Sequence, residues 1–174
     1  DPRIAGVVAG PLVSVIVPTY CRRALLREAV RSALAQDWPN LEVLVVGDHD
    51  PDIEAIAAEL RDEARVRVFD LDRNHGAGGA VPRNAGIELA RGEIVAYLDD
   101  DNAWTPDHLS SVIAAMRRAD ASFAFSSMTA DDRDLHFMRP ELQGIDTSTI
   151  VHRRELVARY GGWKGCHEYY GHDW

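Results

Sequence analysis

The chain has 174 residues, of which 46% are hydrophobic and 27% are charged. Both values are ordinary for a soluble globular protein, and this length is enough for one domain with a proper hydrophobic core. The formal net charge of −9 argues against binding to a nucleic-acid polymer or to an anionic membrane surface. A small phosphorylated ligand remains compatible with this charge, provided that a metal ion neutralises it.

The sequence predicts neither a transmembrane segment nor a signal peptide. The apolar stretch 4–17 contains glycine and proline and is too short to cross a bilayer, and no basic region opens the chain. The two cysteines, Cys21 and Cys166, lie far apart and outside any pairing motif, so we expect free thiols in a reducing compartment. These features favour a cytoplasmic location and leave open a peripheral position at the inner face of the membrane.

Runs of apolar, often β-branched residues alternate along the chain with segments of helical periodicity. The runs predict strands at residues 13–17, 41–46, 66–69, 94–98, 121–128 and 149–152. Apolar residues at helical spacing predict helices at residues 24–35, 51–60, 82–90, 106–116 and 154–160. Asp50-Pro51 and Thr105-Pro106 predict where the second and fourth helices begin. Strands that alternate with helices indicate an α/β fold with a mainly parallel central sheet.

The chemically unusual residues follow the predicted strands directly. Thr19 and Tyr20 follow the first strand, Asp48 follows the second, and the triplet 99–101 follows the fourth. In parallel sheets ligands bind beyond the carboxyl ends of the strands, near a switch in strand order. The sequence therefore predicts one ligand site that gathers these distant residues.

The triplet Asp99-Asp100-Asp101 indicates a site for a hard cation. In an extended chain Asp99 and Asp101 point to one side and Asp100 to the other. Two carboxylates on one side repel by about 2–3 kcal/mol at an effective dielectric constant near 20, unless a cation lies between them. Oxygen ligands without nearby cysteine or histidine favour Mg²⁺ or Mn²⁺ over zinc. The alternative is a solvated acidic turn before the next helix.

Segments in register along nearly the whole chain resemble the family 2 glycosyltransferases, which are enzymes of the GT-A fold that use nucleotide-diphosphate sugars. The matching segments are Val13–Tyr20, Ser32–Gln36, Glu42–Val46, Arg83–Gly86, Arg91–Glu93 and Leu98–Asp101, followed by Trp104 and Pro106. The resemblance implies a single Rossmann-like GT-A catalytic domain over residues 1–174, with its C-terminal part missing. It also implies a nucleotide-sugar donor and Mn²⁺ or Mg²⁺ as cofactor.

The resemblance also implies a role for individual residues. Asp48 matches the acid that pairs with a uracil ring, and Asp101 is the metal ligand together with Asp99. Nucleotide contacts are implied for Pro18, Thr19, Tyr20, Asp48, Arg83, Asp99 and Asp100. For two of these we keep a simpler alternative open: Asp48 caps the turn that follows it, and Arg83 is a surface residue of its helix.

Near the C-terminus, His172-Asp173-Trp174 resembles the family's Glu-Asp-Trp motif, whose aspartate is the catalytic base. Asp173 is therefore the predicted base, and His172 and Trp104 are predicted to contact the acceptor or the donor sugar. We expect His167 and His172 to form hydrogen bonds with substrate or backbone, and the alternative is that they bind a metal ion.

The sequence departs from the family pattern at three places. Cys21 replaces the usual asparagine after Tyr20. Gly47-Asp48 replaces an acidic pair, and His49 and Asp50 follow it in place of small residues. His172 replaces the acid before the predicted base. These departures affect the details of nucleotide and acceptor recognition more than the reaction class.

The function that follows from the resemblance is inverting sugar transfer from a UDP- or dTDP-sugar to an acceptor hydroxyl, with Asp173 as general base. The acceptor is a saccharide, a lipid-linked molecule or a small molecule. A nucleotidyltransferase is one alternative, but it requires a glycine-rich loop after the first strand, and residues 18–23 contain no glycine. The other alternative is a non-catalytic module that binds a sugar nucleotide. Hydrolysis of the donor by the pure protein would distinguish an enzyme from such a module.

Overall fold

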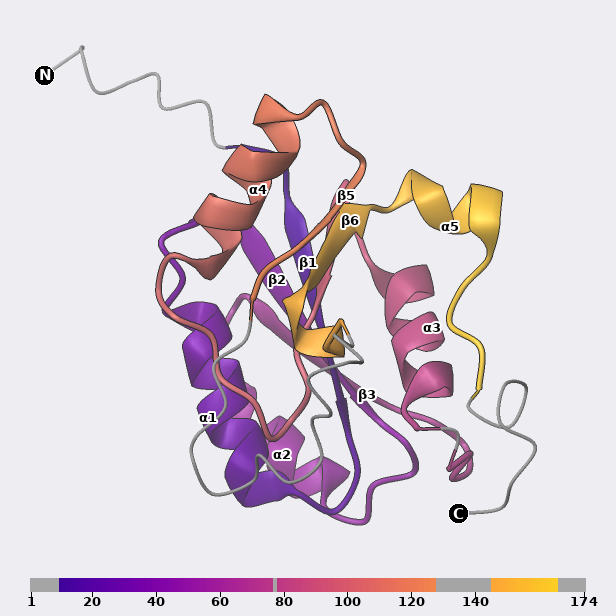
Figure 1. The fold of residues 1–174 in the computed structure, drawn as a ribbon. Helices are drawn as coiled ribbons and strands as arrows, with labels where there is room; N and C mark the ends of the chain where they lie inside the picture. Colours follow the sequence, from indigo (N-terminus) through magenta and orange to yellow (C-terminus); the bar gives the residue numbers. More distant parts are fainter. Residues whose placement is uncertain (1–9, 77, 128–144, 166–174) are drawn as a thin grey trace, which may run out of the picture.

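The computed structural model describes residues 10–76, 78–127 and 145–165, and in this part of the chain one sheet of six strands runs through the molecule (Figure 1). The spatial order is β3-β2-β1-β4-β6-β5. The strands are β1 (Val13–Thr19), β2 (Leu41–Gly47), β3 (Val66–Asp70), β4 (Ile94–Tyr97), β5 (Phe123–Phe125) and β6 (Ile150–Arg153). β1 to β4 pair in parallel, and β6 pairs antiparallel with both β4 and β5. The predicted, mainly parallel α/β fold is confirmed.

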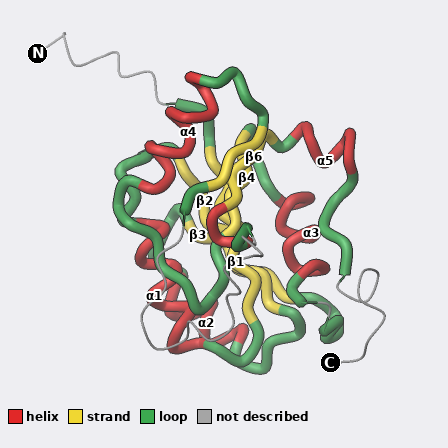
Figure 2. Tube along the Cα trace, in the orientation of Figure 1, coloured by secondary structure: helices red, strands yellow, loops and turns green. Residues whose placement is uncertain are grey.

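Helices cover both faces of the sheet. They are α1 (Arg23–Leu34), α2 (Ile53–Leu60), α3 (Ala80–Leu89), α4 (His108–Arg118) and α5 (Glu155–Tyr160), together with the short 3₁₀ turn η2 (Thr147–Thr149). α1, α2 and α4 lie on one face, and α3 and α5 lie on the other (Figure 2). None of the helices in the described residues has both the length and the apolar character that a membrane span requires.

Most boundaries differ from the prediction by one or two residues, and β5 differs most. α2 begins at Ile53 because the Asp50 carboxylate accepts a hydrogen bond from the Asp52 amide at 2.9 Å, which forms a turn before the helix. α4 begins at His108, whose amide donates to the Thr105 carbonyl at 3.1 Å in a similar turn. β5 has three residues instead of eight and lies at the edge of the sheet.

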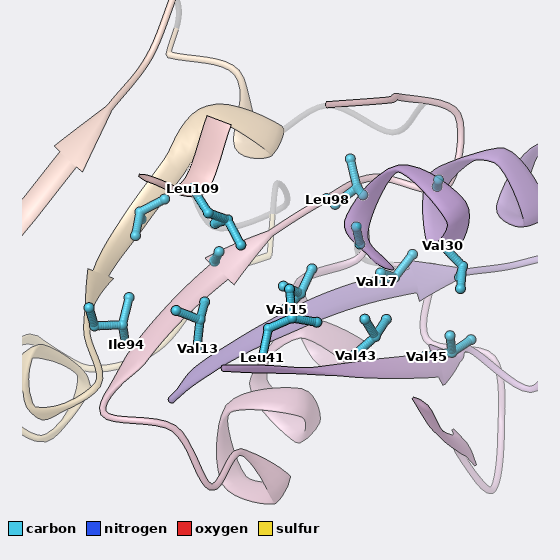
Figure 3. Close-up of a cluster of buried hydrophobic side chains, with 14 of the residues drawn as sticks. Val13, Val15, Val17, Val30, Leu41, Val43, Val45, Ile94, Leu98 and Leu109 are labelled. Atoms are coloured by element: carbon cyan, nitrogen blue, oxygen red, sulfur yellow. The ribbon is translucent and has the colours of Figure 1, made fainter. Parts of the chain in front are cut away.

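The main core lies between the sheet and helices α1, α2 and α4. Alternate residues of β1 and β2 point into it, among them Val13, Val15, Val17, Leu41, Val43 and Val45 (Figure 3). Ile16 and Leu44 point to the opposite face, where they pack with Ile87 and Tyr97. Because both faces of the sheet are covered, the strands appear in the sequence as nearly continuous apolar runs.

A buried polar network closes the amino-terminal edge of the sheet. The Ser14 hydroxyl donates to Glu42 Oε1 at 2.7 Å and accepts from the Gly92 amide at 2.9 Å. Arg67 Nη1 donates to Glu42 Oε2 at 3.2 Å. These contacts satisfy two polar side chains that stand on otherwise apolar strands, and they fix the start of β4 against β1.

The switch in strand order lies between β1 and β4. The chain proceeds from β1 through β2 to β3 in one direction and then returns to the other side of β1 to form β4. The connections from β1 and from β4 therefore lead away from each other and leave a crevice beyond the carboxyl ends of these strands. The predicted ligand residues follow these ends.

The fold predicts a stability change with pH at His108. Its ring stacks on Trp104 with 4.5 Å between centroids, and burial lowers the pKa of His108 to about 4. The folded protein keeps the ring neutral, whereas the unfolded chain takes up a proton near pH 6.5. The free energy of unfolding should therefore fall as pH drops from 6.5 toward 4, and less so in His108→Gln. Urea unfolding at pH 7.5 and pH 5 tests this, and an equal loss in the variant would contradict it.

Candidate functional site

A cavity of about 360 Å³ lies beyond the carboxyl ends of β1, β2 and β4. Its lining residues are Pro18, Thr19, Tyr20, Arg22, Asp48, Gly78, Gly79, Pro82, Arg83, Asp99, Asp100 and Asp101. All the predicted nucleotide and metal residues are among them, so the structure brings these distant positions together. His172 and Asp173 lie outside the described residues.

The charge of the lining is unbalanced. Four carboxylates, at Asp48 and the triplet 99–101, face two guanidinium groups, at Arg22 and Arg83. The cavity therefore carries a formal excess of two negative charges. An anionic ligand would be repelled unless a cation accompanied it.

The three aspartates are divided between the two arginines. Asp99 accepts a hydrogen bond from Arg83 Nη2. Arg22 Nη1 donates both to Asp100 Oδ1 at 3.2 Å and to Asp101 Oδ2 at 2.6 Å. In this structure Asp101 shares an arginine with Asp100, whereas Asp99 pairs with the other arginine, and metal binding by Asp99 and Asp101 stays a prediction. β4 ends at Tyr97 and a turn begins at Asp100, so the alternation of an extended strand does not continue through the triplet.

The backbone of the triplet is held by the 3₁₀ turn η2. The Ser148 hydroxyl accepts from the Asp99 amide at 3.0 Å and from Asn102 Nδ2 at 2.8 Å. Asp146 holds η2 by accepting from the Ser148 amide at 2.8 Å. Ser148, which the sequence did not suggest as a site residue, thus fixes where the carboxylates lie.

Burial makes two of these carboxylates costly to ionise. It raises the pKa of Asp99, and the Arg83 guanidinium opposes the shift. It also raises the pKa of Asp100, against the effect of Arg22. Both groups are therefore stabilised in their ionised form by an adjacent cation.

Arg83 is buried, with 7% of its surface exposed, which rules out the surface-residue alternative. Nη1 donates to the Gly78 carbonyl at 2.7 Å, and the guanidinium lies over the Trp163 ring at 5.4 Å from its centroid. Gly79, at φ +76°, leaves room for it, because a Cβ there would lie 2.6 Å from Nη1. Arg83 is thus fixed between Asp99, the glycine loop and an aromatic ring.

Trp163 is itself held by the helix that carries Arg83. The Trp163 amide donates to Asn84 Oδ1 at 2.7 Å, and Asn84 Nδ2 donates to the Trp163 carbonyl at 2.8 Å. A Cβ at Gly162 would lie 2.3 Å from Asn84 Oδ1, so this approach requires glycine. The segment after α5 is therefore linked directly to α3 beside the cavity.

Asp48 is buried, and its carboxylate organises a distant loop. It accepts from the backbone amides of His75 at 3.0 Å and Gly76 at 3.1 Å, and it lies 3.1 Å from His75 Nδ1. The simpler alternative, that it caps the turn directly after β2, does not describe these contacts. The carboxylate still lines the cavity, so a contact with a nucleotide base stays a prediction.

Asp50 lies outside the cavity lining but bridges the neighbouring turns, a role that the sequence did not suggest. It is 3% exposed, and Oδ2 accepts from the Cys21 amide at 2.8 Å. Its own amide donates to Asp70 Oδ1 at 3.0 Å. Asp50 therefore ties together the turns that follow β1, β2 and β3.

Trp104 does not line the cavity. Its ring stacks on His108, and Nε1 donates to the Ser148 carbonyl at 2.7 Å. These contacts hold η2 against α4. The sugar contact predicted for Trp104 stays a prediction.

The comparison with known families agrees with this geometry. Residues 14–169 match the profile described as Glycosyl transferase family 2. The chain belongs to this family. The family assignment made from the sequence is therefore confirmed.

Several curated relatives are polysaccharide-biosynthesis proteins. The succinoglycan biosynthesis protein ExoW of Rhizobium meliloti is 36% identical over 83% of this chain and 47% of its own length. A Campylobacter jejuni β-1,3-glucosyltransferase, named for the acceptor GalNAc(5)-diNAcBac-PP-undecaprenol, is 35% identical over 87% of this chain and 50% of its own length. The chain thus spans about half the length of these relatives.

Solved glycosyltransferase structures share the GT-A fold. Staphylococcus aureus TarS in complex with UDP-GlcNAc has a TM-score of 0.71 at 24% identity, over 84% of this chain and 46% of that one. The mannosyltransferase PcManGT from Pyrobaculum calidifontis, in complex with GDP-Man and Mn²⁺, has a TM-score of 0.69 at 26% identity, over 88% and 48%. The GT-A fold predicted from the sequence is confirmed.

Proposed function

We propose that this domain transfers a sugar from a nucleotide-diphosphate donor to an acceptor hydroxyl and that the cavity at the carboxyl edge of the sheet binds the donor. The observation that carries this proposal is the convergence of Pro18–Tyr20, Asp48, Arg83 and the triplet 99–101 on one cavity at the switch point. The related glucosyltransferase and the nucleotide-sugar complexes of the structural neighbours support the same function.

A divalent metal fits the residues present. Arg22 Nη1 lies between Asp100 and Asp101, so two carboxylates already converge on one positive group. No group of three or more histidine, cysteine or acidic side chains within the described residues could hold a metal. Mg²⁺ and Mn²⁺ are commonly held by one or two carboxylates plus substrate phosphates, which matches this arrangement. Asp101 is the ligand that we propose first, with Asp99 or Asp100 beside it.

The charge of the cavity explains why the donor would need this ion. Two excess negative charges repel a diphosphate, and a divalent cation cancels them. When bound, the ion would also neutralise the charge that develops on the leaving diphosphate. Burial raises the pKa of Asp99, and the Arg83 guanidinium, which buried contacts hold in place, opposes this rise.

On the acceptor side, Asp173 is the proposed general base. It would remove the proton from the acceptor hydroxyl as that hydroxyl attacks, a contribution of typically about 10²–10⁴-fold. One displacement inverts the configuration at the anomeric carbon. This assignment rests on the sequence motif alone. The acceptor is proposed to be a saccharide, a lipid-linked molecule or a small molecule. The proposed location is cytoplasmic, and a peripheral position at the inner face of the membrane stays open.

The non-catalytic binding module is the alternative from another class. It would bind the nucleotide sugar with metal but release no nucleotide. Slow hydrolysis of the donor by the pure protein would favour the enzyme, because water can replace the acceptor.

The proposal predicts nucleotide binding that depends on metal. UDP affinity measured by calorimetry should be much higher with Mn²⁺ than with chelator, and this gain should disappear in Asp101→Asn, which loses a charged ligand. Asp62→Asn is the matched control, since that side chain is 93% exposed and outside the cavity. Equal UDP affinity in chelator and in Mn²⁺ would contradict the metal assignment.

The second prediction concerns the base. Asp173→Asn keeps the shape of the side chain but cannot accept a proton, so turnover should fall by about 10²-fold or more while donor binding survives. Initial rates and donor calorimetry on the same preparation separate these effects. Transfer near the wild-type rate would place the base elsewhere.

The third prediction concerns the base of the nucleotide. Uracil and thymine present an N3–H donor that a carboxylate can accept, whereas N3 of cytosine is itself an acceptor. If Asp48 reads this group, Asp48→Ala should weaken UDP and dTDP binding more than CDP binding. Asp48 also holds a loop, so a purely structural role is the alternative that this experiment distinguishes. An equal loss for UDP, CDP and GDP would show that Asp48 only holds the loop of His75 and Gly76.

A further inference from the structure

Two arginines contact the aspartate triplet in very different ways. Arg83 is 7% exposed and makes a backbone contact, an ion pair and a contact with an aromatic ring. The side chain of Arg22 is 52% exposed, and its described side-chain contacts are the two carboxylates of Asp100 and Asp101. Arg83 is thus a fixed cation of the site, and Arg22 is free to exchange its partners.

The position of Arg22 in the fold allows such an exchange. Its carbonyl accepts from the Leu26 amide at 3.0 Å, so the backbone is held at the start of α1. The long side chain is not held in this way and lies on the wall of the cavity. A rotation of its side-chain bonds can move the guanidinium without moving the backbone.

We propose that Arg22 competes with the divalent metal for Asp100 and Asp101, and that metal binding transfers its guanidinium from these carboxylates to the diphosphate of the donor. The inference rests on the proposed function, because it requires that a metal and a diphosphate bind in this cavity. It adds a residue that sets metal affinity and couples the metal to the nucleotide.

The competition follows from shared atoms and from charge. Nη1 contacts Asp101 Oδ2 at 2.6 Å and Asp100 Oδ1 at 3.2 Å, and a metal ion held by both carboxylates would lie in the same space between them. A divalent ion and a guanidinium at this position also repel each other. An arginine guanidinium is protonated at any working pH, so deprotonation does not relieve the competition.

The same exchange makes the two ligands help each other. Without a diphosphate, metal binding leaves the Arg22 guanidinium beside a cation and without an anionic partner. With a diphosphate in the cavity, the displaced guanidinium gains phosphate oxygens. Metal and nucleotide should therefore bind cooperatively, and part of that coupling should depend on Arg22.

The test compares Mn²⁺ affinity in the wild type, Arg22→Gln and Arg27→Gln, measured by the paramagnetic resonance signal of free Mn²⁺. Arg27 is the matched control, because it lies on the same helix and pairs with Glu59 outside the cavity. Without nucleotide, Arg22→Gln should bind Mn²⁺ about tenfold more tightly, a typical size for a coupled site. Addition of UDP should raise the Mn²⁺ affinity, and this increase should be smaller in Arg22→Gln than in the wild type or in Arg27→Gln.

The opposite sign overturns the inference. If Arg22→Gln binds Mn²⁺ with equal or lower affinity than the wild type, Arg22 is not a competitor, whether or not the donor proposal holds. Arg22→Lys, which keeps the charge, should stay near the wild type. A higher Mn²⁺ affinity in Arg22→Gln supports the competition even if UDP binds to none of the proteins. That second result would count against the donor proposal and against the transfer of the guanidinium to the diphosphate.

Discussion

The structure depends on how it compensates buried negative charge at the carboxyl edge of its sheet. Asp48, Asp50 and Asp100 are each less than 7% exposed. An ionised carboxylate out of water costs several kcal/mol unless it is paired or hydrogen-bonded. Each is compensated differently. Backbone amides of the loop 75–76 donate hydrogen bonds to Asp48, turn amides donate to Asp50, and the Arg22 guanidinium pairs with Asp100. The turns and loops around the cavity are arranged by these contacts.

This compensation divides the site into a fixed part and an exchangeable part. Backbone amides cannot leave Asp48 without unfolding the loop, and Arg83 is enclosed by Asp99, Gly78 and Trp163. Of the two arginines that line the described cavity, only Arg22 is half exposed, and its described side-chain contacts are those with Asp100 and Asp101. In the proposed donor site, the contacts of Asp48 and Arg83 would stay fixed while Arg22 exchanges its partner. Preorganised groups of this kind are what electrostatic stabilisation of a leaving group requires.

The sequence predicted the layout of the site but not its pairing. Strands buried on both faces produce apolar runs, so the ends of β1, β2 and β4, and with them Asp48 and the triplet 99–101, could be located. The contacts that these residues make could not be predicted. Asn84 meets Trp163 and Asp48 meets Gly76 across long stretches of chain, and neither contact leaves a local pattern. The extended strand that the alternation assumed does not continue through the triplet, because β4 ends at Tyr97 and a turn begins at Asp100.

Two of the departures from the family pattern share one unusual backbone conformation. Cys21 and His49 both adopt the left-handed backbone conformation, at φ 56° and 61°. Asparagine and glycine tolerate this region, whereas other residues in it cost about 1–3 kcal/mol each. Asp50 joins the two turns, because its carboxylate holds the Cys21 amide and its own amide follows His49 and is held by Asp70. The chain therefore holds two left-handed residues in the turns after β1 and β2, and the buried Asp50 carboxylate fixes the first of them through the Cys21 amide.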